Sequence, residues 1–218
     1  MSGETLGRFS SAAQASLLPS TKQALVQLFD LGGSDCSFRN FVRLVIAPAA
    51  RELGEAWVDD RLAFADVTVG MARLQTAVQK FKIPGEGAQM PPPYLGRVFM
   101  ASLIDTQHTL GAAVAARAFG EAGWDVIQLD RPDLADAAIS FLRANPVDLI
   151  ALGVGTTERA GEAQEVVERL RSVAPRAKIY LGGPAVFNAP ELFEPAGADI
   201  LGWDVFDVAR WDVRSVAA

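Results

Sequence analysis

The chemistry open to this chain is suggested first by its only histidine, His108, in the segment 105–111 (DTQHTLG). A neutral imidazole nitrogen is among the commonest protein ligands of metal ions. Gly111, three residues further on, has no side chain and would let the backbone approach closely whatever the histidine holds. A helix-capping or surface histidine could have the same neighbours, so both interpretations stay open on these residues alone.

Two glycine-containing segments could receive a polar or flat ligand. Residues 153–157 (GVGTT) offer backbone amides and two hydroxyls, which suits a phosphate or a ribose. They form neither a Walker loop, since no Gly-Lys-Ser/Thr follows, nor a complete dinucleotide fingerprint. Residues 182–184 (GGP) would permit close approach of a flat group or a tail. Each segment could equally be an ordinary tight turn.

The other reactive side chains are more isolated. Trp57 could cap a planar cofactor or fill a helical core. Cys36 has no second cysteine or histidine nearby, and Asp59 and Asp60 lack the further carboxylates of a divalent-metal site. No second histidine is present for a zinc site, and the usual catalytic groups are missing. We therefore expect a protein that is not an enzyme.

The elements that must position these residues alternate in type after residue 96. Alternation of strands and helices predicts βαβ units with a parallel sheet. The expected strands and the helices between them are 98–104, 126–129, 149–154, 179–181 and 200–201, and 109–122, 133–144, 159–173 and 189–196.

Five such strands favour a flavodoxin-like, Rossmann-type domain, which binds ligands at the carboxyl ends of its strands where the strand order reverses. His108 follows the first expected strand, and the glycine segments 153–157 and 182–184 follow the third and fourth. Gly202 ends the fifth strand. We therefore expect these residues at one edge of the sheet, around a long slot that runs into the domain.

Before residue 83 the pattern is helical, which predicts a small bundle. The expected helices cover 20–31, 37–53 and 63–81, and Pro48 would kink or split the second. The expected apolar faces are Phe38, Phe41, Val42 and Val45 in one helix and Phe64, Val67, Met71, Leu74 and Val78 in the next.

A segment rich in proline and glycine, 83–96, is expected to link the two parts. The chain is therefore predicted to combine α and α/β parts: a helical bundle at 1–82 that would cap a ligand, the linker, and a five-stranded parallel-sheet domain at 97–218.

Composition narrows the function. The 218 residues carry a formal net charge of −6, which argues against direct gripping of a nucleic-acid backbone. A single cysteine fits a reducing compartment. The N-terminus does not resemble a signal peptide, and no apolar run approaches the roughly 18 residues that a membrane-spanning helix needs. We expect a cytoplasmic protein without membrane contact.

A helical bundle containing LGEAW, a linker, and a flavodoxin-like domain with HxxG after its first strand resemble the cobalamin-binding module. This module occurs in corrinoid carriers, methionine synthase and light-sensing regulators, and the resemblance spans residues 36–205. In that family the histidine of DxHxxG coordinates cobalt from below, and the nucleotide tail threads beside an SxL segment and a GG turn. The resemblance implies that His108 is the metal ligand.

The resemblance also implies the remaining cofactor contacts. Gly153 and Gly155 stand where the serine and leucine of SxL stand, and Trp57 resembles the bundle tryptophan above the corrin. The implied contacts are Trp57, Phe64, Val67 and Thr68 at the upper face, Thr106, Gln107, Thr109, Leu110 and Gly111 around His108, and Gly153, Gly155, Thr156, Thr157, Gly182, Gly183 and Gly202 along the tail.

Departures from the family pattern indicate which branch of the family this chain resembles. Thr106 stands where corrinoid enzymes have an aspartate that hydrogen-bonds the ligand histidine, which weakens the case for methyl transfer. Val67 and Thr68 stand where adenosylcobalamin light sensors have a Glu-His pair. We therefore expect hydroxo- or aquocobalamin rather than adenosylcobalamin.

The segments QHTLG and AGWDV resemble the AerR/PpaA-type photosynthesis antirepressors, which are related to the haem- or cobalamin-binding domain of AppA. This resemblance implies a light-responsive regulator acting on a PpsR/CrtJ-type repressor, and the acidic charge agrees with action through a protein. The alternatives are a corrinoid carrier for a methyltransferase, a haem sensor that uses His108, and an interaction domain without a cofactor. The oligomeric state stays open.

Overall fold

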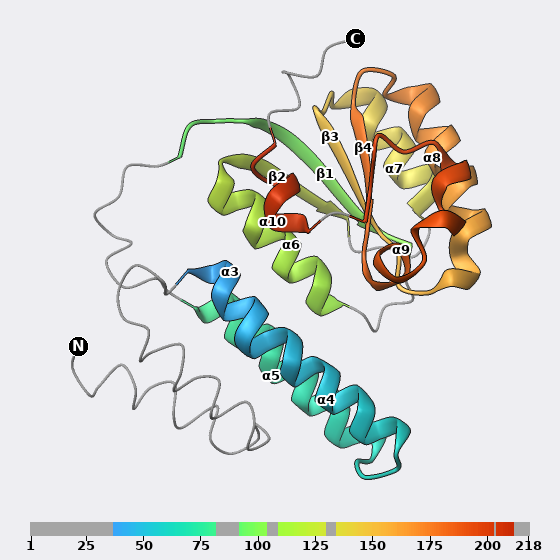
Figure 1. The fold of residues 1–218 in the computed structure, drawn as a ribbon. Helices are drawn as coiled ribbons and strands as arrows, with labels where there is room; N and C mark the ends of the chain where they lie inside the picture. The colour runs from blue at the N-terminus through green and yellow to red at the C-terminus, as the bar shows by residue number, and fades with distance from the viewer. Residues whose placement is uncertain (1–36, 82–91, 104–108, 130–133, 203, 212–218) are drawn as a thin grey trace. The chain divides into compact units, whose positions relative to one another are not determined.

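The computed structural model describes residues 37–81, 92–103, 109–129, 134–202 and 204–211. It divides the chain into two compact units, Met1–Gln89 and Met90–Ala218. The first is helical in its described part and the second is an α/β unit (Figure 1). No helix within the described ranges combines the length and apolar character needed to span a membrane.

The helical unit begins with one uninterrupted helical run made of α3 (Phe38–Phe41), η2 (Val42–Ile46) and α4 (Ala47–Val58). Ser37 caps the run: its Oγ accepts a 3.2 Å hydrogen bond from the backbone N–H of Asn40. This bond satisfies one of the amides that a helix start leaves without a partner.

The expected split at Pro48 does not occur. Proline has no N–H to donate, and its ring crowds the carbonyl four residues earlier, so it normally disrupts a helix interior. Here the preceding turn, η2, is a π turn, in which the N–H of Ala47 donates to the carbonyl of Val42. The wider turn accommodates the proline near the start of α4, and the helix continues past it.

α5 (Phe64–Lys80) packs against α4 through a narrower apolar stripe than expected. Leu74 and Val78 are buried as predicted, but Phe64 is 58% exposed. Close packing occurs instead at Gly70, where an added β-carbon would lie 2.8 Å from the side chain of Leu53. At the other end of the pair, the rings of Phe41 and Phe81 stack with centroids 4.3 Å apart.

The described part of the α/β unit contains a five-stranded sheet in which all pairings are parallel. Its order is β2-β1-β3-β4-β5, which confirms the predicted flavodoxin-like topology. The strands are β1 (Gly96–Ser102), β2 (Trp124–Leu129), β3 (Leu149–Gly153), β4 (Lys178–Gly182) and β5 (Ile200–Leu201). The strand order reverses between β1 and β3.

Helices cover both faces of this sheet (Figure 1). One face packs on α7 (Leu134–Ala144) and α8 (Ala160–Val173), the latter entered through the 3-10 turn η4 (Thr157–Arg159). The other face packs on α6 (Thr109–Ala122), which in turn contacts α10 (Val205–Val208). The core under α7 and α8 is built from alternate strand residues, including Phe99, Ile150, Leu152, Ile179 and Leu181.

The helix expected at 189–196 is wrong. The structure has a short helix, α9 (Pro184–Asn188), followed by two 3-10 turns, η5 (Pro190–Leu192) and η6 (Glu194–Ala196). Pro190 and Pro195 lack the N–H groups that an α-helix across this segment would use. The apolar residues in this segment, whose spacing predicted one α-helix, therefore belong to consecutive short helical turns.

Candidate functional site

The carboxyl edge of the sheet at the switch point has a floor without bulky side chains. Ser102, Gly153 and Gly182 are neighbours in register on β1, β3 and β4, and we call them the strand-end row. All three lie on the sheet face opposite the α7–α8 core, since side chains alternate along a strand. These three residues themselves contribute only two hydrogens and one hydroxymethyl group to this face of the sheet.

Three of the residues predicted around the metal, Thr106, Gln107 and His108, lie outside the described residues. The described chain resumes at Thr109, the first residue of α6. In the same turn, Leu110 is buried, while Gly111 is exposed and an added β-carbon there would meet nothing within 4 Å. The first turn of α6 therefore has free space at the position expected to allow close approach of a ligand.

The loop after β3 forms hydrogen bonds within itself. Gly155 is half-buried, and Thr156 and Thr157 are exposed. Hydrogen bonds from its own backbone N–H and from the Thr156 hydroxyl hold the pKa of the Glu158 carboxyl below its usual range. A charged carboxylate beside these hydroxyls disfavours a bare phosphate and favours a neutral hydroxyl-bearing group such as a sugar.

The glycines that follow β4 and β5 are required by the backbone. Gly183 has φ +100, and an added β-carbon would lie 2.9 Å from the backbone nitrogen of Val154. Gly202 has φ +66 and lies beside the carbonyl of Val186. Only glycine adopts these positive φ values without strain, so the turn interpretation accounts for both residues.

Gly182 is different, because a side chain fills the space above it. An added β-carbon at this position would lie 2.5 Å from Cζ of Tyr180 and closer still to its hydroxyl oxygen. Tyr180 is 6% exposed, and burial, followed by the charge of Asp204, raises the pKa of its phenol above the usual range. The slot expected along the glycines is therefore occupied at its Gly182 end. A tyrosine two residues before a strand-end glycine is the sequence signal for this.

The residues predicted for the upper face lie in the helical unit. Trp57, in the last turn of α4, is 51% exposed, so within this unit it does not fill a core. Its ring centroid lies 6.4 Å from that of Phe64. Val67 is half-buried, and the exposed Thr68 donates its hydroxyl to the carbonyl of Phe64 at 2.8 Å. These residues bring two exposed aromatic rings together at one end of the helix pair.

The remaining candidates from the sequence offer no metal site. Asp59 pairs with Arg61 at 3.3 Å, and Asp60 is exposed. Cys36 lies outside the described residues. Within the ranges that the structure describes, no group of three His, Cys, Asp or Glu side chains could hold a metal ion.

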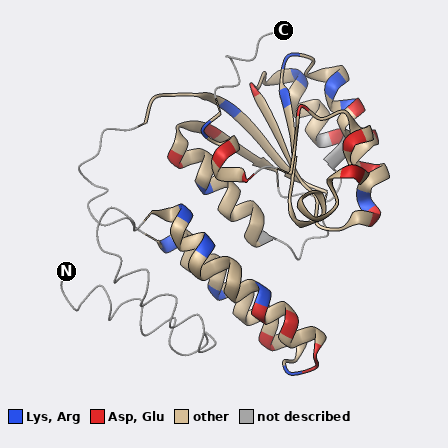
Figure 2. Cartoon of the chain, in the orientation of Figure 1, with Lys and Arg blue, Asp and Glu red and all other residues tan. Residues whose placement is uncertain are grey.

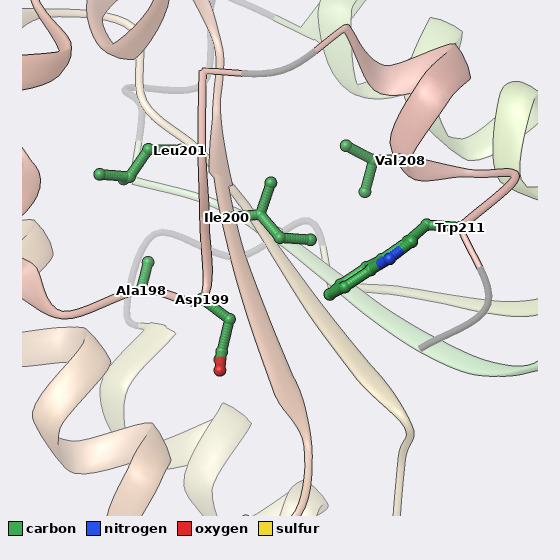
Figure 3. Close-up of a pocket in the computed structure, with 6 residues that line it drawn as sticks. All are labelled: Ala198, Asp199, Ile200, Leu201, Val208 and Trp211. Atoms are coloured by element: carbon green, nitrogen blue, oxygen red, sulfur yellow. The ribbon is translucent and has the colours of Figure 1, made fainter. Parts of the chain in front are cut away.

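A pocket of about 370 Å³ lies beside the edge strand β5, and its lining contains none of the predicted site residues, although Leu201 directly precedes Gly202 (Figure 3). The indole of Trp211 lies along Ile200 and Val208 and gives the pocket an apolar wall. Asp199, also in its lining, already accepts hydrogen bonds from the backbone N–H of Ile179 and from Arg171. The pocket therefore offers a hydrophobic depression rather than a reactive group.

Charge is distributed unevenly over the α/β unit (Figure 2). The outer face of α8 carries ion pairs, among them Arg159–Glu162 and Arg169–Asp136. By contrast, the first charged residue of α6 is Arg117, and it pairs with Glu121 at 2.7 Å. The first turns of α6, which packs on β1 and β2, are uncharged and suit a large, mostly apolar ligand.

Comparisons with known proteins agree with this geometry. The family model of the B12 binding domain matches residues 96–205, which include the sheet and the strand-end row. A Rhodobacter capsulatus relative, named as an uncharacterized 20.5 kDa protein in the bchF-crtJ intergenic region, is 28% identical over 161 residues. That similarity covers 73% of this chain and 83% of the relative.

Solved structures share the fold. The monomethylamine corrinoid protein of Methanosarcina barkeri matches with a TM-score of 0.69 and 12% identity, over 96% of each chain. At this level of identity the likeness concerns the fold alone, and it supports the flavodoxin-like assignment of the α/β unit.

Proposed function

The chain belongs to the B12-binding domain family, and we propose that it is a cobalamin-dependent regulator that is not itself an enzyme. The observation that carries the proposal is the strand-end row at the switch point of the sheet, on the face that packs on α6, whose first turns are uncharged. Doubly wound sheets bind their ligands at this place. Here the floor is small and apolar enough for a bulky ring system to lie close to the strand ends.

We assign the lower cobalt ligand to His108, which directly precedes α6 in the chain. Bound cobalamin would supply a cobalt centre that absorbs visible light and exchanges an axial ligand. Thr106 cannot act as the carboxylate that tunes a ligand histidine in corrinoid enzymes. His108 is therefore suited to anchoring a sensed cofactor rather than to supporting methyl transfer.

The upper-face role is assigned to Trp57, Phe64, Val67 and Thr68. The exposed rings of Trp57 and Phe64 offer flat apolar contact. Val67 and Thr68 supply no ionisable group, so the hydroxo or aquo form is the expected cofactor. A change of ligand at cobalt would act on these side chains, which makes them the sensing element of a two-state switch.

The regulatory role is supported by the name of the Rhodobacter capsulatus relative, which locates that protein in the bchF-crtJ intergenic region. We propose that this chain is a light-responsive antirepressor of photosynthesis genes and that its partner is a repressor of the PpsR/CrtJ type. A net charge of −6 supports contact with a protein rather than with DNA.

Cofactor binding is tested by titrating the full-length apoprotein with hydroxocobalamin in the dark and recording the spectrum after gel filtration. Wild type is expected to retain the corrinoid with a spectrum shifted by histidine ligation. The His108→Ala variant is expected to lose that shift, and the control Arg169→Ala, at an exposed ion pair on α8, to keep it. A wild type that retains no corrinoid, or an unchanged spectrum in His108→Ala, would contradict the assignment.

A corrinoid carrier of a methyltransferase system is the second candidate, because the solved corrinoid protein of Methanosarcina barkeri has the same fold. It predicts that a partner methyltransferase methylates the reduced bound corrinoid. Thr106 argues against it. Replacing Thr106 by Asp should improve methyl acceptance if the chain is a carrier, and should leave a regulator without such activity.

A further inference from the structure

The strand-end row is closed at one end by a residue of this chain. Tyr180 lies two residues before Gly182 on β4, so both side-chain positions are on the same sheet face. Its ring runs toward the carboxyl end of the strand, because its outer atoms Cε1, Cζ and Oη are those nearest to Gly182. The ring therefore covers the Gly182 end of the row, while Gly153 has the Ser102 hydroxyl 3.3 Å from where a β-carbon would lie.

The ring of Tyr180 covers a part of the sheet face that a ligand could otherwise contact. In register, Tyr180 lies between Ala151 on β3 and Ile200 on β5. Without the ring, the face formed by Ala151, Gly153 and Gly182 would be continuous and would carry one methyl group and two hydrogens. With the ring, a ligand that lies over Ser102 and Gly153 meets an aromatic wall before it reaches Gly182.

From this geometry we propose that Tyr180 limits the depth of the site and selects among corrinoids by their nucleotide appendage. The inference rests on the proposed cobalamin-binding function. A corrinoid without the nucleotide has only its ring to accommodate, and leaves Tyr180 in its buried position. A complete cobalamin must displace the ring of Tyr180 from a place where it is 6% exposed, or leave its appendage outside the row.

The test compares two ligands on the full-length apoprotein: hydroxocobalamin and diaquocobinamide, which lacks the nucleotide. Dissociation constants are measured by equilibrium dialysis in the dark. The wild type is expected to bind diaquocobinamide at least as tightly as hydroxocobalamin. In Tyr180→Val, which keeps a residue favoured in strands, we expect the preference to move toward hydroxocobalamin by about tenfold, a difference that such titrations resolve easily.

Two control variants distinguish the effect of losing the Tyr180 ring from the effect of a general loosening of the core. Tyr180→Phe keeps the ring and should keep the wild-type preference. Leu181→Ala removes a fully buried side chain from the opposite face of the same strand and should also leave the preference unchanged. A preference that is the same in Tyr180→Val as in wild type, or that moves equally in Leu181→Ala, would overturn the proposal.

A measurement on the wild type alone keeps the proposal falsifiable if Tyr180→Val does not fold. Thermal unfolding at equal ligand concentrations should show diaquocobinamide raising the midpoint at least as much as hydroxocobalamin. A wild type that binds hydroxocobalamin more tightly than diaquocobinamide would reject the role of Tyr180 and leave the proposed function intact. A wild type that binds neither corrinoid would reject the proposed function itself.

Discussion

At the scale of single residues, Gly183 is a position where backbone geometry leaves no room for a side chain. Its φ of +100 is unfavourable for any other residue, and a β-carbon would lie 2.9 Å from the nitrogen of Val154. We expect Gly183→Ala to lower the free energy of unfolding by about 2–3 kcal/mol, combining strain and collision. Denaturant unfolding followed by circular dichroism measures this directly.

Replacing glycine by alanine should instead raise the free energy of unfolding where the glycine has an ordinary φ and free space around it. Gly120 lies in α6, is exposed, and would place its β-carbon at least 4 Å from any neighbour. Gly120→Ala should raise the free energy of unfolding by about 0.5–1 kcal/mol, because alanine loses less entropy in a helix. If both variants are destabilised equally, backbone conformation does not explain the role of Gly183.

Tyr180 makes stability sensitive to alkaline pH. Burial raises the pKa of its phenol in the folded protein, whereas the unfolded chain ionises near the ordinary value of about 10. The contribution of Tyr180 is therefore complete below pH 10 and is lost as the pH rises above it. We expect the free energy of unfolding to fall by up to about 1.4 kcal/mol per pH unit in that window.

The matched variant for this prediction is Tyr180→Phe, which keeps the ring and removes the ionisable group. Its unfolding free energy should fall less steeply than that of wild type above pH 10. Absorbance at the phenolate band, compared between wild type and Tyr180→Phe, gives a second readout of the Tyr180 phenol. Tyr180 should ionise only when the protein unfolds, and ionisation of Tyr180 in the folded protein near pH 10 would contradict its buried position.

At the scale of elements, Asp199 joins the last two strands to α8. Its Oδ2 accepts a 2.8 Å hydrogen bond from the backbone N–H of Ile179 and a 3.0 Å hydrogen bond from Arg171. Asp199→Ala would leave a strand amide and a guanidinium without this partner, and should lower the free energy of unfolding by about 1–3 kcal/mol. Thermal melting of the apoprotein measures the loss.

An exposed ion pair supplies the comparison. Arg169 contacts Asp136, whose side chain is 93% exposed, and such pairs contribute little. Arg169→Ala should change the free energy of unfolding by at most about 0.5 kcal/mol. If Arg169→Ala lowered the free energy of unfolding as much as Asp199→Ala, the effect of Asp199 would be explained by its surface charge rather than by its hydrogen bond to the amide of Ile179.

The elements themselves were predictable where one physical signal dominated. The runs 149–153 and 179–182 are apolar on both faces, as a strand covered by helices on both sides must be, and the parallel arrangement followed from βαβ alternation. The prediction was wrong at 189–196, where proline positions outweigh apolar spacing. At Pro48 the split does not occur, because the preceding π turn accommodates the proline.

The site was predictable only in part, because a glycine in the sequence can mark either a positive φ or a place where another group approaches the backbone closely. Gly183 and Gly202 are explained by positive φ, which the sequence cannot distinguish from an open slot. Gly182 lies beside a ring from its own strand, and which neighbour fills a gap is decided by three-dimensional packing. The metal-site prediction for His108 stays a prediction, since that residue lies outside the described ranges.

At the scale of the whole molecule, net charge separates the proposed regulator from a DNA-binding protein. A chain with net charge −6 is repelled by phosphates, so alone it should not retard operator DNA in a mobility-shift assay at physiological salt. With a PpsR/CrtJ-type repressor present, the cobalamin-loaded protein should reduce repressor–DNA complex formation differently in light and darkness. His108→Ala should abolish the light dependence, while Arg169→Ala, at an exposed ion pair on α8, preserves it. Retardation of DNA by this chain alone, or an equal light response in His108→Ala, would contradict regulation through a protein partner by a histidine-anchored cofactor.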